Sequence, residues 1–215
     1  ASYLELERPI PAADCPAAAA AGQSLLMEKY RQLFGHLDTR CAQVLLTEED
    51  FANENRQHNL SGTLRRLLDL NTVPIVNEND AITSAIKMED KQGVFYDNDR
   101  LAGLTAAAIQ ADALVLLSNI DALYTGPPDE AGSQRIAHYN PQVPIRFGQS
   151  SALGRGGMES KLIAAQRTAQ SGIPVVIASG LDSDGLPAAL AGHDVGTYFS
   201  PVTADNTGSS SDRQT

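Results

Sequence analysis

The sequence has few cations and no long apolar run. Among its 215 residues, 16 lysines and arginines stand against 26 aspartates and glutamates, giving a formal net charge of -10. So acidic a surface repels nucleic acids and anionic membranes, and we expect neither as a partner. No apolar stretch reaches the roughly 20 residues that span a bilayer. Lysine is scarce, so any lysine-dependent chemistry must use Lys29, Lys87, Lys91 or Lys161.

Cysteine and histidine are also scarce. The two cysteines, Cys15 and Cys41, form no CxxC pair, and the four histidines are scattered without the spacing of metal ligands. We therefore predict no metal ligand set made by the protein and a reduced, cytoplasmic setting. Neither the GxxxxGK[ST] loop nor the GxGxxG turn of common nucleotide sites occurs.

The pattern of apolar residues alternates between helical and strand periods. Helices are predicted at 16–34, 49–70, 99–110 and 156–171, and strands at 41–46, 73–76, 114–117, 175–178 and 195–199. Residues 81–96 are less regular and could hold a hairpin near 90–93. The strands are continuous apolar runs, which indicates burial on both faces and a parallel sheet between helix layers. The sequence thus predicts an α/β fold with residues 1–200 as one domain and a polar, disordered tail at 201–215.

Polar side chains follow several of the predicted strands. The clusters are Thr47–Asp50, Asn77–Asp80, Ser118–Asp121 and Ser179–Gly180. In open α/β sheets, ligands bind at the carboxyl ends of the strands. We expect the functional site at this edge.

Two acidic clusters could bind an amino acid. The first runs from Asn77 to Asp80, where a carboxylate could meet an ammonium group and the amides could meet carboxylates. It could equally be an Asx-rich turn. The second is Asp97–Asn98–Asp99, directly before a predicted helix. Taken alone, the second cluster is better explained as a helix N-cap.

A glycine-rich segment enters the helix predicted at 156–171. Its residues are Arg155, Gly156, Gly157, Met158, Glu159, Ser160 and Lys161. Backbone N–H groups at such a helix start can hold phosphate, and Lys161 could reach its outer oxygens. The alternative is an exposed loop with one solvated lysine. Ser118 and Asn119, after the third predicted strand, could border a nucleotide or form an ordinary turn.

Several segments together resemble the amino acid kinase family, and within it the glutamate 5-kinases and the kinase half of pyrroline-5-carboxylate synthases. They are AAAAAGQSLLMEKYRQLF, AQVLLTEEDF, NLSGTLRRLLDLNTVPIVNENDA, YDNDRLAGL, ADALVLLSNIDALYT, GRGGMESKLIAA and VGTYF, in family order. The resemblance implies an open three-layer αβα sandwich with a mainly parallel sheet, and ATP with Mg²⁺ as the phosphoryl donor. It implies phosphorylation of the side-chain carboxylate of L-glutamate, the first step of proline biosynthesis.

The resemblance also implies roles for single residues. Asp80 and Asn98 would bind glutamate, with Asn77, Asp97 and Asp99 beside them. Ser118 and Asn119 would lie by the nucleotide, the segment from Arg155 to Lys161 would wrap the phosphates, and Lys161 would stabilise the moving phosphoryl group. A homo-oligomer, proline feedback and a glutamyl phosphate reductase partner are further implications. Rival interpretations are a kinase of another amino acid and an inert relative that binds glutamate or proline.

The chain departs from the family pattern in two places. The family opens with two strands carrying Lys-x-Gly-Ser and Ser-Gly-Ala segments that this sequence lacks, so roughly sixty N-terminal residues and two central strands are expected to be missing. Asn119 stands where the family usually has Asp. Because this carboxylate would organise catalytic lysines, we predict that Asn119→Asp raises turnover.

Overall fold

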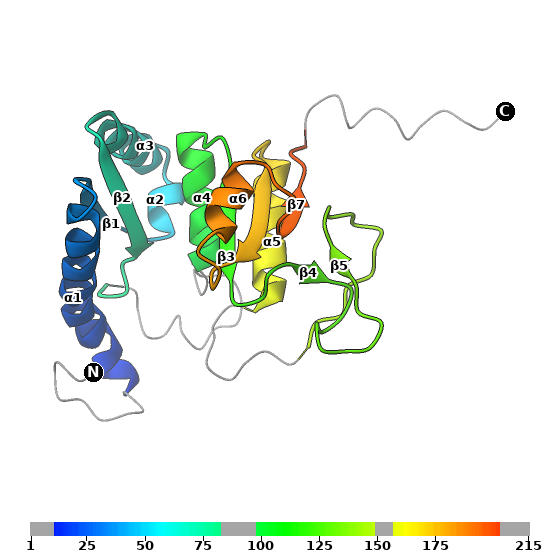
Figure 1. Ribbon diagram of the computed structural model, residues 1–215. Helices are drawn as coiled ribbons and strands as arrows, with labels where there is room; N and C mark the ends of the chain where they lie inside the picture. The colour runs from blue at the N-terminus through cyan, green and yellow to red at the C-terminus, as the bar shows by residue number, and fades with distance from the viewer. Residues whose placement is uncertain (1–10, 83–97, 149–156, 203–215) are drawn as a thin grey trace. The chain divides into compact units, whose positions relative to one another are not determined.

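A computed structural model describes residues 11–82, 98–148 and 157–202 of this protein (Figure 1). The chain divides into two compact units, Ala1–Asn98 and Asp99–Thr215, and each is described by itself. The predicted hairpin near 90–93 and almost all of the predicted tail lie outside the described residues. The prediction of a single domain over residues 1–200 stays a prediction.

The first unit is a parallel strand pair with helices. Its elements are η2 (Ala12–Asp14), α1 (Cys15–Gly35), β1 (Arg40–Leu46), α2 (Glu49–Ala52), α3 (Glu54–Asp69) and β2 (Thr72–Glu78). β1 and β2 pair in parallel register from Arg40↔Thr72 to Leu46↔Glu78. Asn53 separates α2 from α3, because its side chain accepts a hydrogen bond from Arg56 N (3.1 Å) as the N-cap of α3.

Burial in the first unit is lower than the apolar sequence predicts. Of the described β1 and β2 residues only Leu46 is buried, so the expectation of burial on both faces is wrong for this pair. α1 has no buried residue, and Leu25, Leu26 and Leu33 on its predicted apolar face are 47%, 43% and 64% exposed. The helical period was therefore a correct guide to the secondary structure of α1 but not to its burial, whereas Leu60 and Leu64 of α3 are buried.

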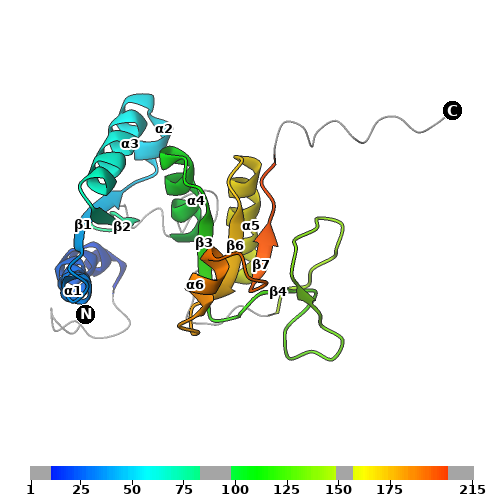
Figure 2. The ribbon, with the colours of Figure 1, turned by 45° about the horizontal axis from the view of Figure 1, so that its top comes forward.

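The second unit holds a three-stranded sheet and a hairpin. Its elements are α4 (Asn98–Ile109, whose first residue falls in the first unit), β3 (Leu114–Ser118), β4 (Leu123–Tyr124), β5 (Arg135–Ile136), α5 (Met158–Gln170), β6 (Val175–Ser179), α6 (Gly185–Leu190) and β7 (Thr197–Phe199). The strand order is β3-β6-β7, visible in Figures 1 and 2. β3 and β6 are parallel, and β7 runs antiparallel to β6. α5 packs on all three strands, and α6 packs on β3 and β6.

The core of this unit joins the sheet, α5 and the β4–β5 hairpin. Leu123, Ala165, Val175 and Ile177 are fully buried in it. Thr197, also fully buried, fixes the hairpin to β7: its hydroxyl donates to Ile136 O (2.6 Å) and accepts from Leu123 N (2.8 Å). A buried hydroxyl is tolerated here because both its donor and its acceptor capacity are used.

The predicted fold class is confirmed: the protein is α/β with mostly parallel strand pairing. Outside residues 81–96, each predicted helix and strand is present within a few residues of its expected ends, except that the helix predicted at 49–70 is divided into α2 and α3. The β4–β5 hairpin and α6 were not predicted, because two-residue strands and a six-residue helix give too little periodicity. Of the helices that the structure describes, none is long and apolar enough to cross a membrane.

Candidate functional site

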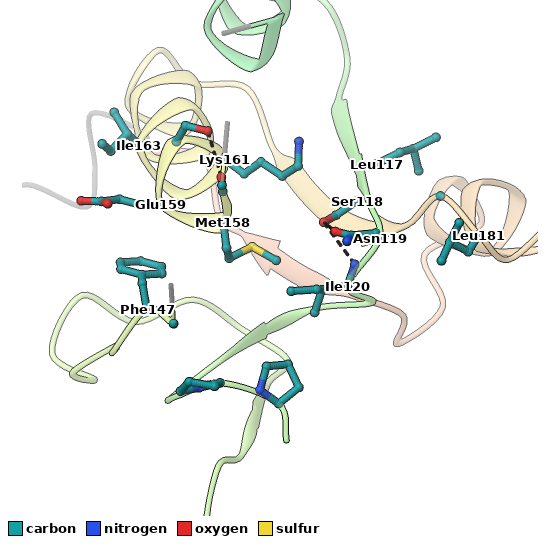
Figure 3. A pocket seen from close by; sticks show the side chains of 16 residues that line it. Leu117, Ser118, Asn119, Ile120, Phe147, Met158, Glu159, Lys161, Ile163 and Leu181 are labelled. Carbon is teal, nitrogen blue, oxygen red and sulfur yellow. Dashed lines mark hydrogen bonds between the residues drawn. The ribbon is translucent and has the colours of Figure 1, made fainter. Parts of the chain in front are cut away.

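A cavity of about 960 Å³ opens at the carboxyl end of the sheet in the second unit (Figure 3). Its walls come from the ends of β3 and β6, the first turns of α5, the loop after β4 and the segment after β5. The lining residues are Leu117, Ser118, Asn119, Ile120, Pro127, Pro128, Phe147, Gly148, Gly157, Met158, Glu159, Ser160, Lys161, Ile163, Gly180 and Leu181. Its volume is within the range of small-molecule sites.

Parallel pairing brings the polar ends of β3 and β6 together. Ser118 and Ser179 are register partners, and Gly180 N donates to Ser118 O at 2.7 Å. A Cβ on Gly180 would lie 3.2 Å from Leu117 Cβ, so a residue without a side chain suits this close approach. The strand ends thus form one edge of the cavity, as expected for an open parallel sheet.

Ser118 and Asn119 shape the turn after β3. The buried Ser118 hydroxyl accepts from Ile120 N (3.2 Å) and donates to Asn119 Oδ1 (3.4 Å). This hydroxyl turn fixes the backbone that carries Asn119 to the cavity wall. The amide of Asn119 is uncharged, so Asn119 brings no carboxylate to the cavity.

α5 presents its N-terminus to the same cavity. Gly157 is the N-cap residue in extended conformation, and among the described residues no side chain is seen to cap the helix. Ser160 Oγ donates to Gly157 O (2.9 Å), and the first-turn N–H groups of an α-helix have no acceptor within the helix. Since the helix dipole is positive at this end, the site favours an anion.

Lys161 forms a bidentate ion pair with Asp99 inside the second unit. Its ammonium nitrogen lies 2.8 Å from both Asp99 carboxylate oxygens. The two side chains are only 15% and 12% exposed, so water screens the pair weakly. Figure 3 shows the Lys161 side chain extending from α5 toward β3. Asp99 therefore holds the ammonium group in one place, on a side chain that lines the same cavity as Ser118 and Asn119.

The structure brings most of the predicted nucleotide residues to this cavity. Lys161, Ser118, Asn119 and the stretch Gly157–Ser160 line it, and Asp99 contacts Lys161. Arg155 and Gly156 lie outside the described residues. Asp99, which was expected beside glutamate, contacts Lys161, and its role in glutamate binding stays a prediction.

Of the residues predicted to bind the amino acid substrate, those other than Asp99 lie in the first unit where they are described. Asn77 is the second-last residue of β2, so the polar cluster begins inside the strand rather than after it. Asp80 follows β2 and is exposed, and Asn98 is the exposed first residue of α4. Asp97 lies outside the described residues.

Sequence reasoning missed the apolar part of the cavity, chiefly Phe147, Pro127 and Pro128. These residues lie in loops, where no periodicity identifies them. The nearby hairpin carries Tyr124, whose hydroxyl donates to Asp121 Oδ1 (3.1 Å). Partial burial and this carboxylate raise the pKa of Tyr124 above its ordinary value.

In the part of the chain that the structure describes, no group of three or more histidine, cysteine, aspartate or glutamate side chains could hold a metal ion. The charged groups that line the cavity there are Glu159 and Lys161, and Lys161 is already paired with Asp99. A polyanionic ligand would be held mainly by N–H groups, by Lys161 and by cations that it brings with it.

Comparison with known proteins gives two groups of similar sequences. The chain is 46% identical over 202 residues to Delta-1-pyrroline-5-carboxylate synthase 1 of Oryza sativa subsp. japonica, covering 92% of this chain and 28% of that protein. It is 45% identical over 204 residues to glutamate 5-kinase of Bifidobacterium longum subsp. infantis, covering 92% of this chain and 52% of that protein. The chain therefore spans about half the length of the latter and under a third of the former.

Among solved structures, an isopentenyl phosphate kinase superposes with a TM-score of 0.55 at 14% identity, over 82% of this chain and 66% of that one. At this identity the match shows the fold alone, and it agrees with the predicted fold class. The sequence model of the amino acid kinase family matches residues 5–179. This match covers far more than half of the 215 residues, and the chain belongs to the amino acid kinase family.

Proposed function

We propose that this chain carries the kinase activity that phosphorylates the side-chain carboxylate of L-glutamate with ATP. Family membership and the names of the similar proteins support the class of reaction. The observation that carries the proposal is the buried Asp99–Lys161 pair at a cavity whose wall includes the N-terminus of a helix. This arrangement suits a phosphate group that gains charge.

The phosphate end of ATP lies, in this proposal, between Lys161 and the first turn of α5. The N–H groups of that turn hold the phosphate oxygens, and Ser118 and Asn119 border them from β3. Mg²⁺ comes with the nucleotide, since it prefers phosphate oxygens and water to an all-protein cage. Arg155 and Gly156 complete the phosphate loop by resemblance.

The chemical step is an in-line displacement at the γ-phosphorus. A side-chain carboxylate oxygen of glutamate forms the new P–O bond, and the bond to the oxygen bridging the β- and γ-phosphorus breaks. ADP leaves with that electron pair, and the product is an acyl phosphate. Lys161 stabilises the charge on the transferring group, and Asp99 keeps the ammonium in position, so the protein contributes positioning and electrostatics.

The residues proposed to bind glutamate are those that the family resemblance implies. Asp80 and Asn98 bind it, with Asn77 and Asp97 beside them. Asp99 differs from this group, because its contact with Lys161 makes it a positioning residue. Because the acyl phosphate is unstable in water, a reductase that consumes it is part of the proposal. Proline feedback and a homo-oligomeric assembly are also part of it, by resemblance.

A hydroxamate-trapping assay on the full-length native protein tests the proposal. ATP, Mg²⁺ and hydroxylamine are supplied with glutamate, aspartate or N-acetylglutamate. Hydroxamate is expected from glutamate alone, and Lys161→Met is expected to reduce it by at least about a hundredfold. Lys29→Met, at an exposed position on α1, is the matched control and should keep the wild-type rate.

Two outcomes would contradict the proposal. Hydroxamate from aspartate or N-acetylglutamate instead of glutamate would assign another substrate. No hydroxamate with any acceptor, although ATP binds, would favour the rival interpretation of an inert relative that only binds its ligands.

A further inference from the structure

The ion pair between Asp99 and Lys161 joins two helices of the second unit. Asp99 lies in the first turn of α4, and Lys161 lies in the first turn of α5. Gly103 follows Asp99 by four residues, so the two share one face of α4. Thr168 follows Lys161 by seven residues, which places it on the face of α5 that carries the lysine. Each helix therefore has one member of the ion pair and one further residue on the same side.

These two further residues are in close contact. A Cβ on Gly103 would lie 2.5 Å from Thr168 Oγ1 and 3.8 Å from the backbone oxygen of Ala164. Gly103 is buried, and Thr168 is only 3% exposed. Glycine is a poor helix former, so helix propensity does not explain its place inside α4. The contact with Thr168 does, because only a residue without a side chain fits there.

A side chain at position 103 would force the two helices apart. An ordinary contact with a Cβ atom is 3.4 Å or longer, so α4 and α5 would have to separate by about 1 Å to admit a methyl group. Rotation of Thr168 gives little relief, because a β-branched side chain in a helix has few rotamers and this one is buried. Asp99 lies one helical turn from Gly103, about 6 Å along the axis. The same movement would therefore draw its carboxylate away from Lys161.

We infer that Gly103 and Thr168 are positioning residues, whose contact sets the spacing between α4 and α5 at which Asp99 holds the ammonium group of Lys161. The inference rests on the proposed function, in which Lys161 stabilises the transferring phosphoryl group. Gly103 and Thr168 are not among the described residues that line the cavity. They act through the bidentate contact of 2.8 Å between Lys161 Nζ and both Asp99 oxygens, a geometry that tolerates little displacement.

A compensating pair of substitutions in the full-length native protein tests this inference. Gly103→Ala should lower kcat in the hydroxamate assay about tenfold under saturating substrates, with a smaller change in the KM for ATP. Thr168→Ala removes the hydroxyl and leaves the Cβ of residue 168, which lies 3.9 Å from the added methyl group, an ordinary contact. The double variant Gly103→Ala/Thr168→Ala should therefore recover kcat to within about threefold of wild type. Gly62→Ala on α3, where the added Cβ meets no neighbouring atom within 4 Å, is the control and should keep the wild-type rate.

Two further readouts separate positioning of Lys161 from a general loss of packing. In the Asp99→Asn background the ion pair is already impaired, so Gly103→Ala should lower kcat by less than about twofold more. Acetylation of Lys161 by acetic anhydride is followed by mass spectrometry, with the exposed Lys29 as internal reference. It should be faster in Gly103→Ala than in wild type, because the nearly buried amine is no longer held by its carboxylate, and it should return to the wild-type rate in the double variant.

The outcomes distinguish this inference from the proposed function. A full tenfold loss from Gly103→Ala in the Asp99→Asn background would overturn the inference, since the loss would not pass through the ion pair. Wild-type kcat and wild-type acetylation in Gly103→Ala would overturn it too. If Gly103→Ala alone is unstable, a folded double variant that still lacks activity decides against the inference. A wild-type protein without kinase activity, in which acetylation of Lys161 still responds to Gly103→Ala, would overturn the proposed function alone.

Discussion

Replacing Asp99 with asparagine removes one charge from a nearly buried ion pair and keeps the shape of the side chain. Lys161 Nζ lies 2.8 Å from both carboxylate oxygens, and the two side chains are 15% and 12% exposed. Loss of one partner from a fully buried pair costs about 3–5 kcal/mol, because the remaining charge is uncompensated. Asparagine retains one acceptor for Lys161, and some water reaches the pair. We therefore expect the free energy of unfolding to fall by about 2–3 kcal/mol.

The same substitution should also reduce catalysis. In the proposed reaction, Asp99 fixes the ammonium group at the place where charge develops. Misplacing such a group by about 1 Å lowers the reaction rate about a hundredfold. We expect Asp99→Asn to lower kcat by roughly this factor, with a smaller change in the KM for ATP. Urea unfolding measures the stability, and the hydroxamate assay under saturating substrates measures kcat.

Asp194→Asn is the matched control for this experiment. It also removes a carboxylate from an ion pair, with Arg135 at 2.9 Å, but Asp194 is 75% exposed. Such exposed pairs contribute about 0–1 kcal/mol, so the control should change neither stability nor kcat appreciably. If Asp99→Asn matched the control in both measurements, the assignment of Asp99 as the residue that positions Lys161 would be refuted.

Three further substitutions test the fold and the site. Gly196→Ala should destabilise the protein by about 3 kcal/mol in urea unfolding, because φ is +70° there and the new Cβ would lie 2.0 Å from Ile177 O; a stability within 1 kcal/mol of wild type would contradict this geometry. Thr197→Val should cost about 2–3 kcal/mol, since Leu123 N loses its buried acceptor, and an unchanged urea midpoint would argue against that bond. Asn119→Asp was predicted to raise turnover. Because Lys161 already has a carboxylate partner, we now expect kcat to rise by less than about threefold. A tenfold rise would instead support the reasoning that a carboxylate at position 119 organises the catalytic lysine.

The sequence predicted the parts of this protein that depend on long periodic segments. α1, α3, α4, α5 and the four longer strands were all expected, because each contains a helical apolar pattern or a mainly apolar run of at least four residues. The antiparallel direction of β7 could not be predicted, since three residues carry no information about their pairing partner. Burial in the first unit was also overestimated, because an apolar residue can lie on an exposed face.

The candidate site also contains residues that the sequence predicted and residues that it did not. Gly157–Lys161, Ser118 and Asn119 were found because polar residues after strands and glycines before a helix have a chemical meaning of their own. The pairing of Asp99 with Lys161 could not be predicted, since 62 residues separate them in the chain. Phe147 gave no signal either, because a single aromatic residue in a loop has many structural roles.

An isotope-transfer experiment on the full-length native protein tests the central claim most directly. L-Glutamate labelled with ¹⁸O in its side-chain carboxylate is incubated with ATP, Mg²⁺ and hydroxylamine, and the released phosphate is analysed by mass spectrometry. If the carboxylate attacks the γ-phosphorus, one ¹⁸O atom appears in each phosphate, and Lys161→Met abolishes this transfer. Phosphate released from ATP without ¹⁸O would contradict the account.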